Sequence, residues 1–131
     1  YEVEAGVRVM HTPGHSAGTM ALIVETIEGP VAITGDGIAN AAVVASKVNA
    51  NVFWNEADSI RSIERITEAA EIIYPGHDRP FKVLKNGEID YLEDRTLTFF
   101  GIDVNEPNIS IKPERIKPFV MPGIEGQQLT D

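Results

Sequence analysis

HTPGHSAGT, at residues 11–19, holds two of the three histidines of the chain and directly follows the apolar run VRVM. Two later stretches have a similar design: ITGDG at residues 33–37 and YPGHD at residues 74–78 place a carboxylate or an imidazole beside glycine. Each of the three stretches follows an apolar segment that predicts a strand. Because the ends of neighbouring strands lie side by side in a sheet, we expect these polar side chains to converge at one edge.

Five segments around these loops predict strands. Residues 6–10 alternate apolar and polar side chains, whereas residues 19–26 and 31–34 are apolar and β-branched, which is typical of strands buried on both faces. Residues 71–74 predict a strand that ends at the last of the three loops. Residues 81–92 predict a hairpin, because an Asn-Gly pair separates two short apolar runs.

The clearest helix signal is EADSIRSIERITEAAEII, at residues 56–73, where isoleucine repeats at helical spacing with charged residues between the repeats. Asp58 or Ser59 is expected to cap the start of this helix. Residues 38–48 fit either a helix or a loop, because their valines weaken the helical pattern.

The composition is that of a single globular domain. The 131 residues are 43% hydrophobic and 24% charged, and no apolar run approaches the roughly 20 residues that cross a bilayer. The absence of cysteine excludes disulfides and thiolate metal ligands, and it fits the cytoplasmic location that we predict. A net charge of −9 repels phosphate backbones and argues against a simple nucleic-acid-binding module. A nuclease stays open, because bound metal ions supply local positive charge.

His15, Asp36 and His77 are the side chains of the three loops best suited to bind a cation. Imidazole nitrogen and carboxylate oxygen are donors that zinc, iron and manganese accept, and a carboxylate can bridge two ions. Two ions about 3.5–4 Å apart lower the pKa of bound water towards about 7, and the resulting hydroxide attacks an ester, thioester, lactone, amide or phosphodiester. A glycine beside each ligand is expected to let the backbone turn sharply. Each loop alone is a common turn, so the prediction of a metal site depends on the order and spacing of the three loops along the chain.

TPGHSAG, TGDG and PGHD resemble the third, fourth and fifth metal-binding motifs of the metallo-β-lactamase-fold hydrolases, over residues 7–83. The resemblance implies that His15 is a ligand of a first metal, Asp36 the bridging carboxylate and His77 a ligand of a second metal. The implied cofactor is a pair of divalent ions, zinc foremost, with iron or manganese as alternatives. The chain is similar to small stand-alone metallo-β-lactamase-domain proteins and to glyoxalase II-like and lactonase-like members. The implied fold is α+β, a four-layer αββα sandwich with the metals at one sheet edge.

Three further residues of the first loop are assigned to a second layer around the ligands. The resemblance implies that His11 is not itself a ligand and acts in the second shell or as a structural residue. Thr12 and Ser16 are candidate donors of hydrogen bonds to the metal ligands, with closure of the loop itself as the alternative.

Three residues outside the first loop are open to two interpretations each. Phe53 and Trp54 either line a pocket or anchor the start of the predicted helix, and core packing is the expectation. Asp78 either orients a neighbouring group or lies at the surface, and the surface is the expectation.

The H-x-H-x-D-H motif, which supplies the remaining ligands in this family, is absent from the chain, which holds three histidines in all. Three ligands shared by two metals do not close a catalytic site. Half of a sandwich would also leave an apolar sheet face bare. The chain therefore resembles the C-terminal half of the fold, and we expect the N-terminal half, as a separate or a cleaved chain, to complete it. A higher oligomer is compatible with this expectation.

The sequence thus predicts part of a dinuclear metal-dependent hydrolase, with Asp36 as its catalytic residue. A metal-bound hydroxide is expected to act on a small ester, thioester or lactone. The alternatives are a metal-dependent phosphodiesterase or nuclease, and a non-catalytic or regulatory protein that keeps the fold. Residues 1–100 are assigned to the half-domain, and residues 101–131 to an irregular tail that packs on the domain or on a partner.

Overall fold

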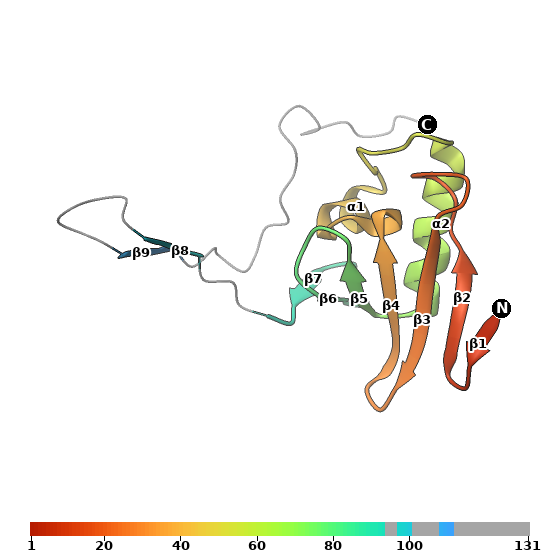
Figure 1. Ribbon diagram of the computed structural model, residues 1–131, viewed down its shortest axis with the longest axis horizontal. Coiled ribbons are helices and arrows are strands. Elements are labelled where there is room, and N and C mark those ends of the chain that lie inside the picture. The colour runs from red at the N-terminus through yellow and green to blue at the C-terminus, as the bar shows by residue number, and fades with distance from the viewer. Residues whose placement is uncertain (94–96, 101–107, 112–131) are drawn as a thin grey trace.

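The computed structural model describes residues 1–93, 97–100 and 108–111. Its main feature is a seven-stranded mixed sheet in which strand order follows chain order, from β1 to β7 (Figure 1). The pair β4 and β5 is parallel and every other neighbouring pair is antiparallel. The strands are β1 Glu2–Glu4, β2 Val7–His11, β3 Met20–Thr26, β4 Gly29–Gly35, β5 Ile72–Pro75, β6 Phe81–Val83 and β7 Ile89–Tyr91.

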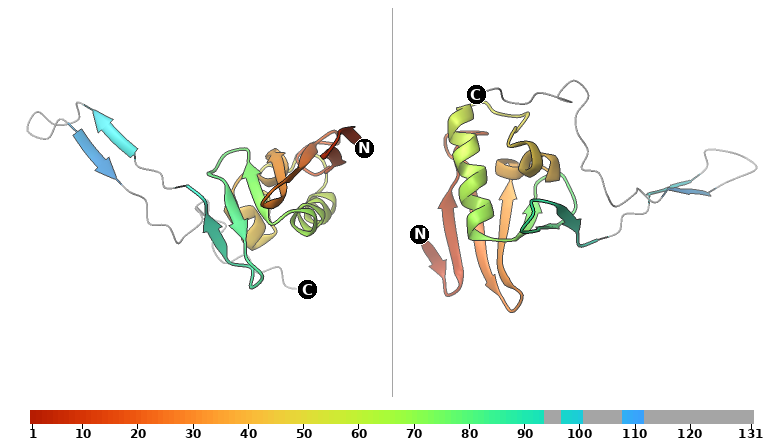
Figure 2. Two further views of the ribbon diagram at one scale, coloured as in Figure 1. Left: turned by 90° about the horizontal axis from the view of Figure 1, so that it is seen from below. Right: turned by 180° about the vertical axis from the view of Figure 1, so that it is seen from behind.

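Three helices connect β4 to β5, as a parallel pair requires. They are the 3₁₀ turn η1 Asp36–Ile38 and the helices α1 Ala41–Ser46 and α2 Glu56–Ala69. Helix α2 lies along one face of the sheet, where Ile63 and Ile66 are fully buried against Ile23 and Ile73 of the strands (Figure 2). Among the described residues, none of the helices has the length and apolar character of a membrane span.

The start of α2 differs from the expectation. Asn55 is the N-cap, and its side chain accepts a hydrogen bond from the backbone N–H of Asp58 at 2.9 Å. Asparagine caps helices as well as aspartate or serine does, and it starts the helix one turn earlier than Asp58 or Ser59 would. Residues 38–48, which fitted a helix or a loop, contain the last residue of η1 and the short helix α1. Asn40 caps α1, because its side chain accepts a hydrogen bond from the backbone N–H of Val43.

The expected burial of β3 and β4 on both faces is wrong for the described part of the chain. Ala21 and Ile23 are fully buried beneath α2, but Leu22 and Ile33 on the opposite face are 38% and 46% exposed. Leu22 pairs with Ile33, and Ile33 pairs with Tyr74, so these three side chains form an apolar row across β3, β4 and β5. We call this the open face. The described residues cover one side of the sheet and leave the open face accessible.

The C-terminal part of the chain is described only in pieces. The predicted hairpin is confirmed as β6 and β7, with Gly87 at a φ of 81° in its turn. Asn108–Ile111, inside the stretch expected to be irregular, form strand β9, which pairs with β8, Leu97–Phe100. The alternating pattern of NISI permits this strand. The rest of the predicted tail lies outside the described residues, and the division at residue 100 stays a prediction.

Asp78 is a structural residue, and the expectation of a surface aspartate is wrong. Its carboxylate accepts hydrogen bonds from the hydroxyl of Tyr91 at 2.9 Å and from the backbone N–H groups of Ala41 and Arg79 at 3.2 and 2.8 Å. The Arg79 guanidinium lies 3.9 Å above the ring of Tyr91 and donates to the carbonyl of Glu93. This cluster joins the loop after β5 to the start of α1 and to β7.

The Asp78 cluster gives Tyr91 a measurable pH signature. Burial, the hydrogen bond to Asp78 and the charge of Asp78 raise the pKa of Tyr91 to about 12. The unfolded phenol ionises near its ordinary pKa of about 10, so the contribution of Tyr91 to stability is complete below that pH. It is lost between about pH 10 and about pH 12, and it amounts to about 2 to 3 kcal/mol.

Tyr91→Phe should remove this pH dependence. Between about pH 9 and about pH 12, the free energy of unfolding of the wild type should fall by about 2 to 3 kcal/mol more than that of the variant. Urea denaturation at several pH values measures it. Tyr1→Phe, at a side chain that is 93% exposed, is the matched control and should follow the wild type. Parallel pH profiles for Tyr91→Phe and the wild type would contradict the assignment.

Candidate metal centre

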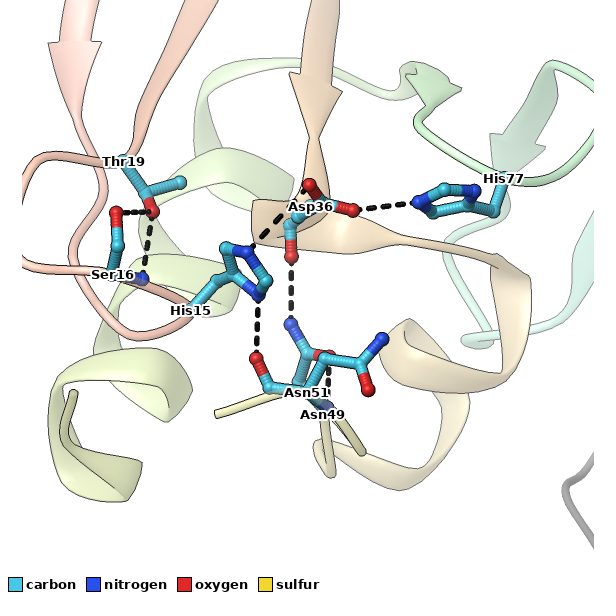
Figure 3. A network of polar contacts seen from close by, with 7 residues as sticks. All are labelled: His15, Ser16, Thr19, Asp36, Asn49, Asn51 and His77. Atoms are coloured by element: carbon cyan, nitrogen blue, oxygen red, sulfur yellow. Dashed lines mark hydrogen bonds and ion pairs between the residues drawn. The ribbon is translucent and has the colours of Figure 1, made fainter. Parts of the chain in front are cut away.

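The three loops predicted to converge do meet at one edge of the sheet. The loop after β2 and the ends of β4 and β5 all lie at the edge that carries α1, because β2, β4 and β5 run in the same direction (Figure 1). The Asp36 carboxylate lies between the two imidazoles (Figure 3). Its Oδ1 is 2.7 Å from His77 Nε2, and its Oδ2 is 3.7 Å from His15 Nε2.

The site consists of two pairs of side chains that share Asp36. Within residues 1–93, 97–100 and 108–111, no three His, Cys, Asp or Glu side chains form one group able to hold a metal ion. Each oxygen of Asp36 instead faces one imidazole, which is the arrangement expected of a bridging carboxylate. The side chains of His15, Asp36 and His77 are 24%, 40% and 66% exposed, so the site is open to solvent and to further ligands.

The hydrogen bonding of His15 fits a metal ligand. Its Nδ1 lies 2.6 Å from the backbone carbonyl oxygen of Asn51, which can only accept, so Nδ1 carries the proton. The lone pair is then on Nε2, the nitrogen that faces Asp36. A carbonyl that fixes one ring nitrogen and frees the other is the usual support of a metal-binding histidine. His77 Nε2 lies 2.7 Å from Asp36 Oδ1, a carboxylate oxygen that only accepts, so in the metal-free chain this nitrogen donates a proton that a cation would replace. With that exchange, the residues present fit a pair of divalent cations.

Glycine is needed at this edge for close approach as well as for turns. A Cβ on Gly76 would lie 2.8 Å from the carbonyl carbon and oxygen of Gly35, the residue before Asp36. Gly14, at a φ of 151°, would place a Cβ 2.5 Å from the Cα of Ser59. The sharp turn that we expected applies at Gly14 and at Gly35, whose φ is 51°. Gly76 is required because only a bare backbone fits against Gly35.

Helix α2 holds the first loop through three contacts at helical spacing. Ser59 packs against Gly14, the Ser62 hydroxyl donates to the carbonyl of Pro13 at 2.7 Å, and Arg65 donates to the carbonyl of His11 at 3.1 Å. Positions three residues apart lie on the same side of a helix. One side of α2 therefore fixes the course of the backbone up to His15.

The residues assigned to the second layer bind within their own loop. His11 Nε2 donates to the carbonyl of Ala17 at 2.7 Å, and Ser16 hydrogen-bonds Thr19 through its hydroxyl at 2.9 Å. Thr12 is buried, and its hydroxyl has no hydrogen-bond partner among the described residues. In that part of the chain none of the three hydrogen-bonds the side chain of a candidate ligand, and the roles assigned to them stay predictions.

The residues that do contact the candidate ligands lie between α1 and α2 and were not predicted from the sequence. The Asn49 side chain donates to the carbonyl of Asp36 at 2.8 Å, and the carbonyl of Asn51 accepts from His15. Phe53 is 81% exposed and Trp54 59% exposed, so the expectation of core packing is wrong for both. The centre of the Phe53 ring lies 5.3 Å from that of His15, edge to face. Two asparagines in a short loop were the available signal.

Comparison with known proteins finds similar hydrolases. No family model matches the chain. An N-acyl homoserine lactonase from a Bacillus species is 36% identical over 83 residues, which cover 60% of this chain and 33% of the lactonase. The structure of an N-acyl homoserine lactone hydrolase with the product N-hexanoyl-L-homoserine at its catalytic metal centre matches with a TM-score of 0.52 and 32% identity, over 60% of this chain and 33% of that one.

A probable metal-dependent hydrolase from Staphylococcus aureus matches with a TM-score of 0.59 and 26% identity, over 74% of this chain and 38% of that chain. The chain thus spans about a third of the length of the relatives it matches. The resemblance to metallo-β-lactamase-fold hydrolases and the α+β fold class are both confirmed.

The contact between Gly76 and Gly35 predicts the outcome of a conservative substitution. Gly76→Ala forces a methyl group against the carbonyl of Gly35 and should lower the free energy of unfolding by about 1 to 3 kcal/mol. Gly18→Ala is the matched control, because a Cβ there meets no atom within 4 Å. Thermal denaturation of the two variants measures the difference. Equal melting temperatures would show that the two strands do not need this close approach.

Proposed function

Because the chain is related to metallo-β-lactamase-fold hydrolases, we propose that it is part of a dinuclear metal-dependent hydrolase that opens lactones. The single observation that carries the proposal is the position of Asp36, whose two carboxylate oxygens face His15 Nε2 and His77 Nε2 at 3.7 and 2.7 Å. The relatives include lactonases and a probable metal-dependent hydrolase. A cytoplasmic location stays a prediction.

In this proposal His15 and Asp36 would hold a first cation, and Asp36 and His77 would hold a second. Zinc is the first choice for this set of nitrogen and oxygen donors, with iron and manganese as alternatives. The cations supply Lewis acidity towards water and towards the carbonyl oxygen of the substrate. Asp36 keeps the two sites adjacent, and the solvent-exposed edge gives water and substrate access.

Within the protein, the protonation of His15 is fixed before a cation arrives. The Nδ1–H group donates to the carbonyl of Asn51, which leaves Nε2 ready to coordinate. The backbone N–H of His77 donates to the carbonyl of Ala39 at 2.8 Å, which ties the last loop to the segment that follows Asp36. Both histidines are thereby held by main-chain contacts on the same side of the sheet as Asp36.

The remaining ligands and the cover of the open face are assigned to the rest of the fold. Three ligands for two cations leave each cation with two protein donors, and zinc sites in proteins use three or four. The open face, with Leu22, Ile33 and Tyr74 partly exposed, is of the kind that another layer of a sandwich buries. This remaining part, on the same polypeptide or on another, completes the site in our proposal.

A lactone or a related small ester is the preferred substrate class. The lactonase relatives favour it, and the net charge of −9 repels the phosphate backbone that a nuclease would have to bind. A non-catalytic metal-binding protein is the second candidate, and the number of bound metals with the activity of the complete protein distinguishes the two.

Asp36→Ala in the complete protein should remove at least one of two bound zinc ions and lower the rate of N-acyl homoserine lactone hydrolysis by about a hundredfold or more. Elemental analysis and a lactone hydrolysis assay measure the two effects. His11→Ala, at an imidazole that donates to the carbonyl of Ala17 in its own loop, should keep both metals and most of the activity. Hydrolysis by Asp36→Ala at the wild-type rate, or an equal loss in His11→Ala and His15→Ala, would contradict the assigned roles.

If another layer covers the open face, the effect of a substitution there on stability should differ between the complete protein and the 131-residue chain. In the complete protein, Ile33→Lys should lower the free energy of unfolding by about 1.5 to 3 kcal/mol, the cost of not burying an isoleucine. In the 131-residue chain alone it should have a small effect, because Ile33 is already 46% exposed. Ile27→Lys, at a fully exposed turn, should be neutral in both. Urea denaturation that shows equal effects of Ile33→Lys in the two contexts would rule out a partner layer on this face.

A further inference from the structure

We infer that Asn49 is a positioning residue, and that its side-chain amide holds the two ligand loops in register and fixes the protonated nitrogen of His15. The inference rests on the proposed function for its relevance to metal binding. The state of His15 that it describes belongs to the metal-free chain and is measured there.

Asn49 connects two segments through one buried amide group. It is 7% exposed, its Nδ2 donates to the carbonyl of Asp36 at 2.8 Å, and its Oδ1 accepts from the backbone N–H of Asn51 at 3.2 Å (Figure 3). Both partners have a fixed role, since a carbonyl only accepts and a backbone N–H only donates, and they determine the orientation of the amide. A side-chain amide offers a separate donor and acceptor at the same distance from the backbone.

The second of these contacts leads directly to His15. Asn51, held by Asn49 through its N–H, accepts the Nδ1–H of His15 on its own carbonyl at 2.6 Å. Two residues further on, the N–H of Phe53 donates to the carbonyl of His15 at 3.1 Å, and the Phe53 ring meets the imidazole edge to face. The segment from Asn49 to Phe53 thus holds both the main chain and the ring of His15.

The same amide therefore acts on both members of a ligand pair. Through Asp36 it fixes the backbone that carries the carboxylate, and through Asn51 it fixes the ring that faces this carboxylate at 3.7 Å. Without it, a partly buried carbonyl and an N–H lose their partner, and Asn51 loses the contact that holds its carbonyl at His15. The Nδ1–H form of the His15 imidazole is then no longer favoured over the Nε2–H form. The fraction in the Nε2–H form must move its proton to Nδ1 before Nε2 can bind a metal.

Long-range ¹H–¹⁵N NMR of the metal-free chain at about pH 8, where imidazole is mostly neutral, tests the inference. In the wild type, His15 should carry its proton on Nδ1, and His11, which donates from Nε2 to Ala17, should show the opposite tautomer and serve as the internal reference. Asn49→Ala should convert His15 to a mixture of tautomers and leave His11 unchanged. An unchanged His15 tautomer in Asn49→Ala would overturn the inference.

Asn51→Ala is the matched control, because Asn51 contributes through its main-chain atoms and keeps them in the variant. It should preserve the His15 tautomer. In the complete protein, competition with a chromophoric chelator should show that Asn49→Ala weakens Zn²⁺ binding by about 10- to 100-fold and Asn51→Ala by less than about 3-fold. Equal weakening by both variants would overturn the role of the Asn49 amide.

Asn49→Asp separates the two contacts and serves if Asn49→Ala does not fold. Aspartate keeps an acceptor for the N–H of Asn51 but sets a second oxygen against the carbonyl of Asp36. It should therefore keep the His15 tautomer and still weaken Zn²⁺ binding about tenfold or more, and wild-type affinity would overturn the inference. If the wild-type protein binds no Zn²⁺ while the tautomers respond as described, the proposed function fails and the positioning role of Asn49 stands.

Discussion

The parallel pairing of β4 with β5 is the constraint on which the rest of the site depends. It places the ends of both strands at the same edge, and it brings the backbone of Gly76 against that of Gly35. Asp36 and His77, each one residue beyond this contact, are thereby neighbours although 40 residues separate them. The helices between the two strands exist because a parallel pair needs a crossover, and that crossover also supplies Asn49 and Asn51.

The three candidate ligands can be predicted from the sequence, whereas the residues that hold them cannot, for a physical reason. His15, Asp36 and His77 are polar residues beside glycine at strand ends, and that local pattern can be recognised in the chain itself. The hydrogen bond from the His15 side chain to the main-chain carbonyl of Asn51 reaches a loop without periodicity, and no local sequence pattern predicts it. The same applies to Asp78, whose partners outside its own loop come from α1 and from β7.

The errors concerning burial have a different origin. An apolar, β-branched strand predicts that both faces are covered, but it does not say which polypeptide provides the cover. Ala21 and Ile23 meet α2, whereas Leu22 on the other side of the same strand is partly exposed. The predicted N-cap of α2 was wrong because Asn55, Asp58 and Ser59 are all residue types that cap helices well. Which of them caps the helix depends on the direction from which the preceding loop enters it.

The three contacts between α2 and the first loop limit how the length of this protein can vary. Ser59, Ser62 and Arg65 reach the loop from one side of the helix, and each added residue turns the following part of a helix by about 100°. An insertion early in α2 would swing Ser62 and Arg65 away from the loop that ends at His15. Insertions and deletions between Asp36 and His77 should therefore be confined, in related sequences, to the stretches outside this helix.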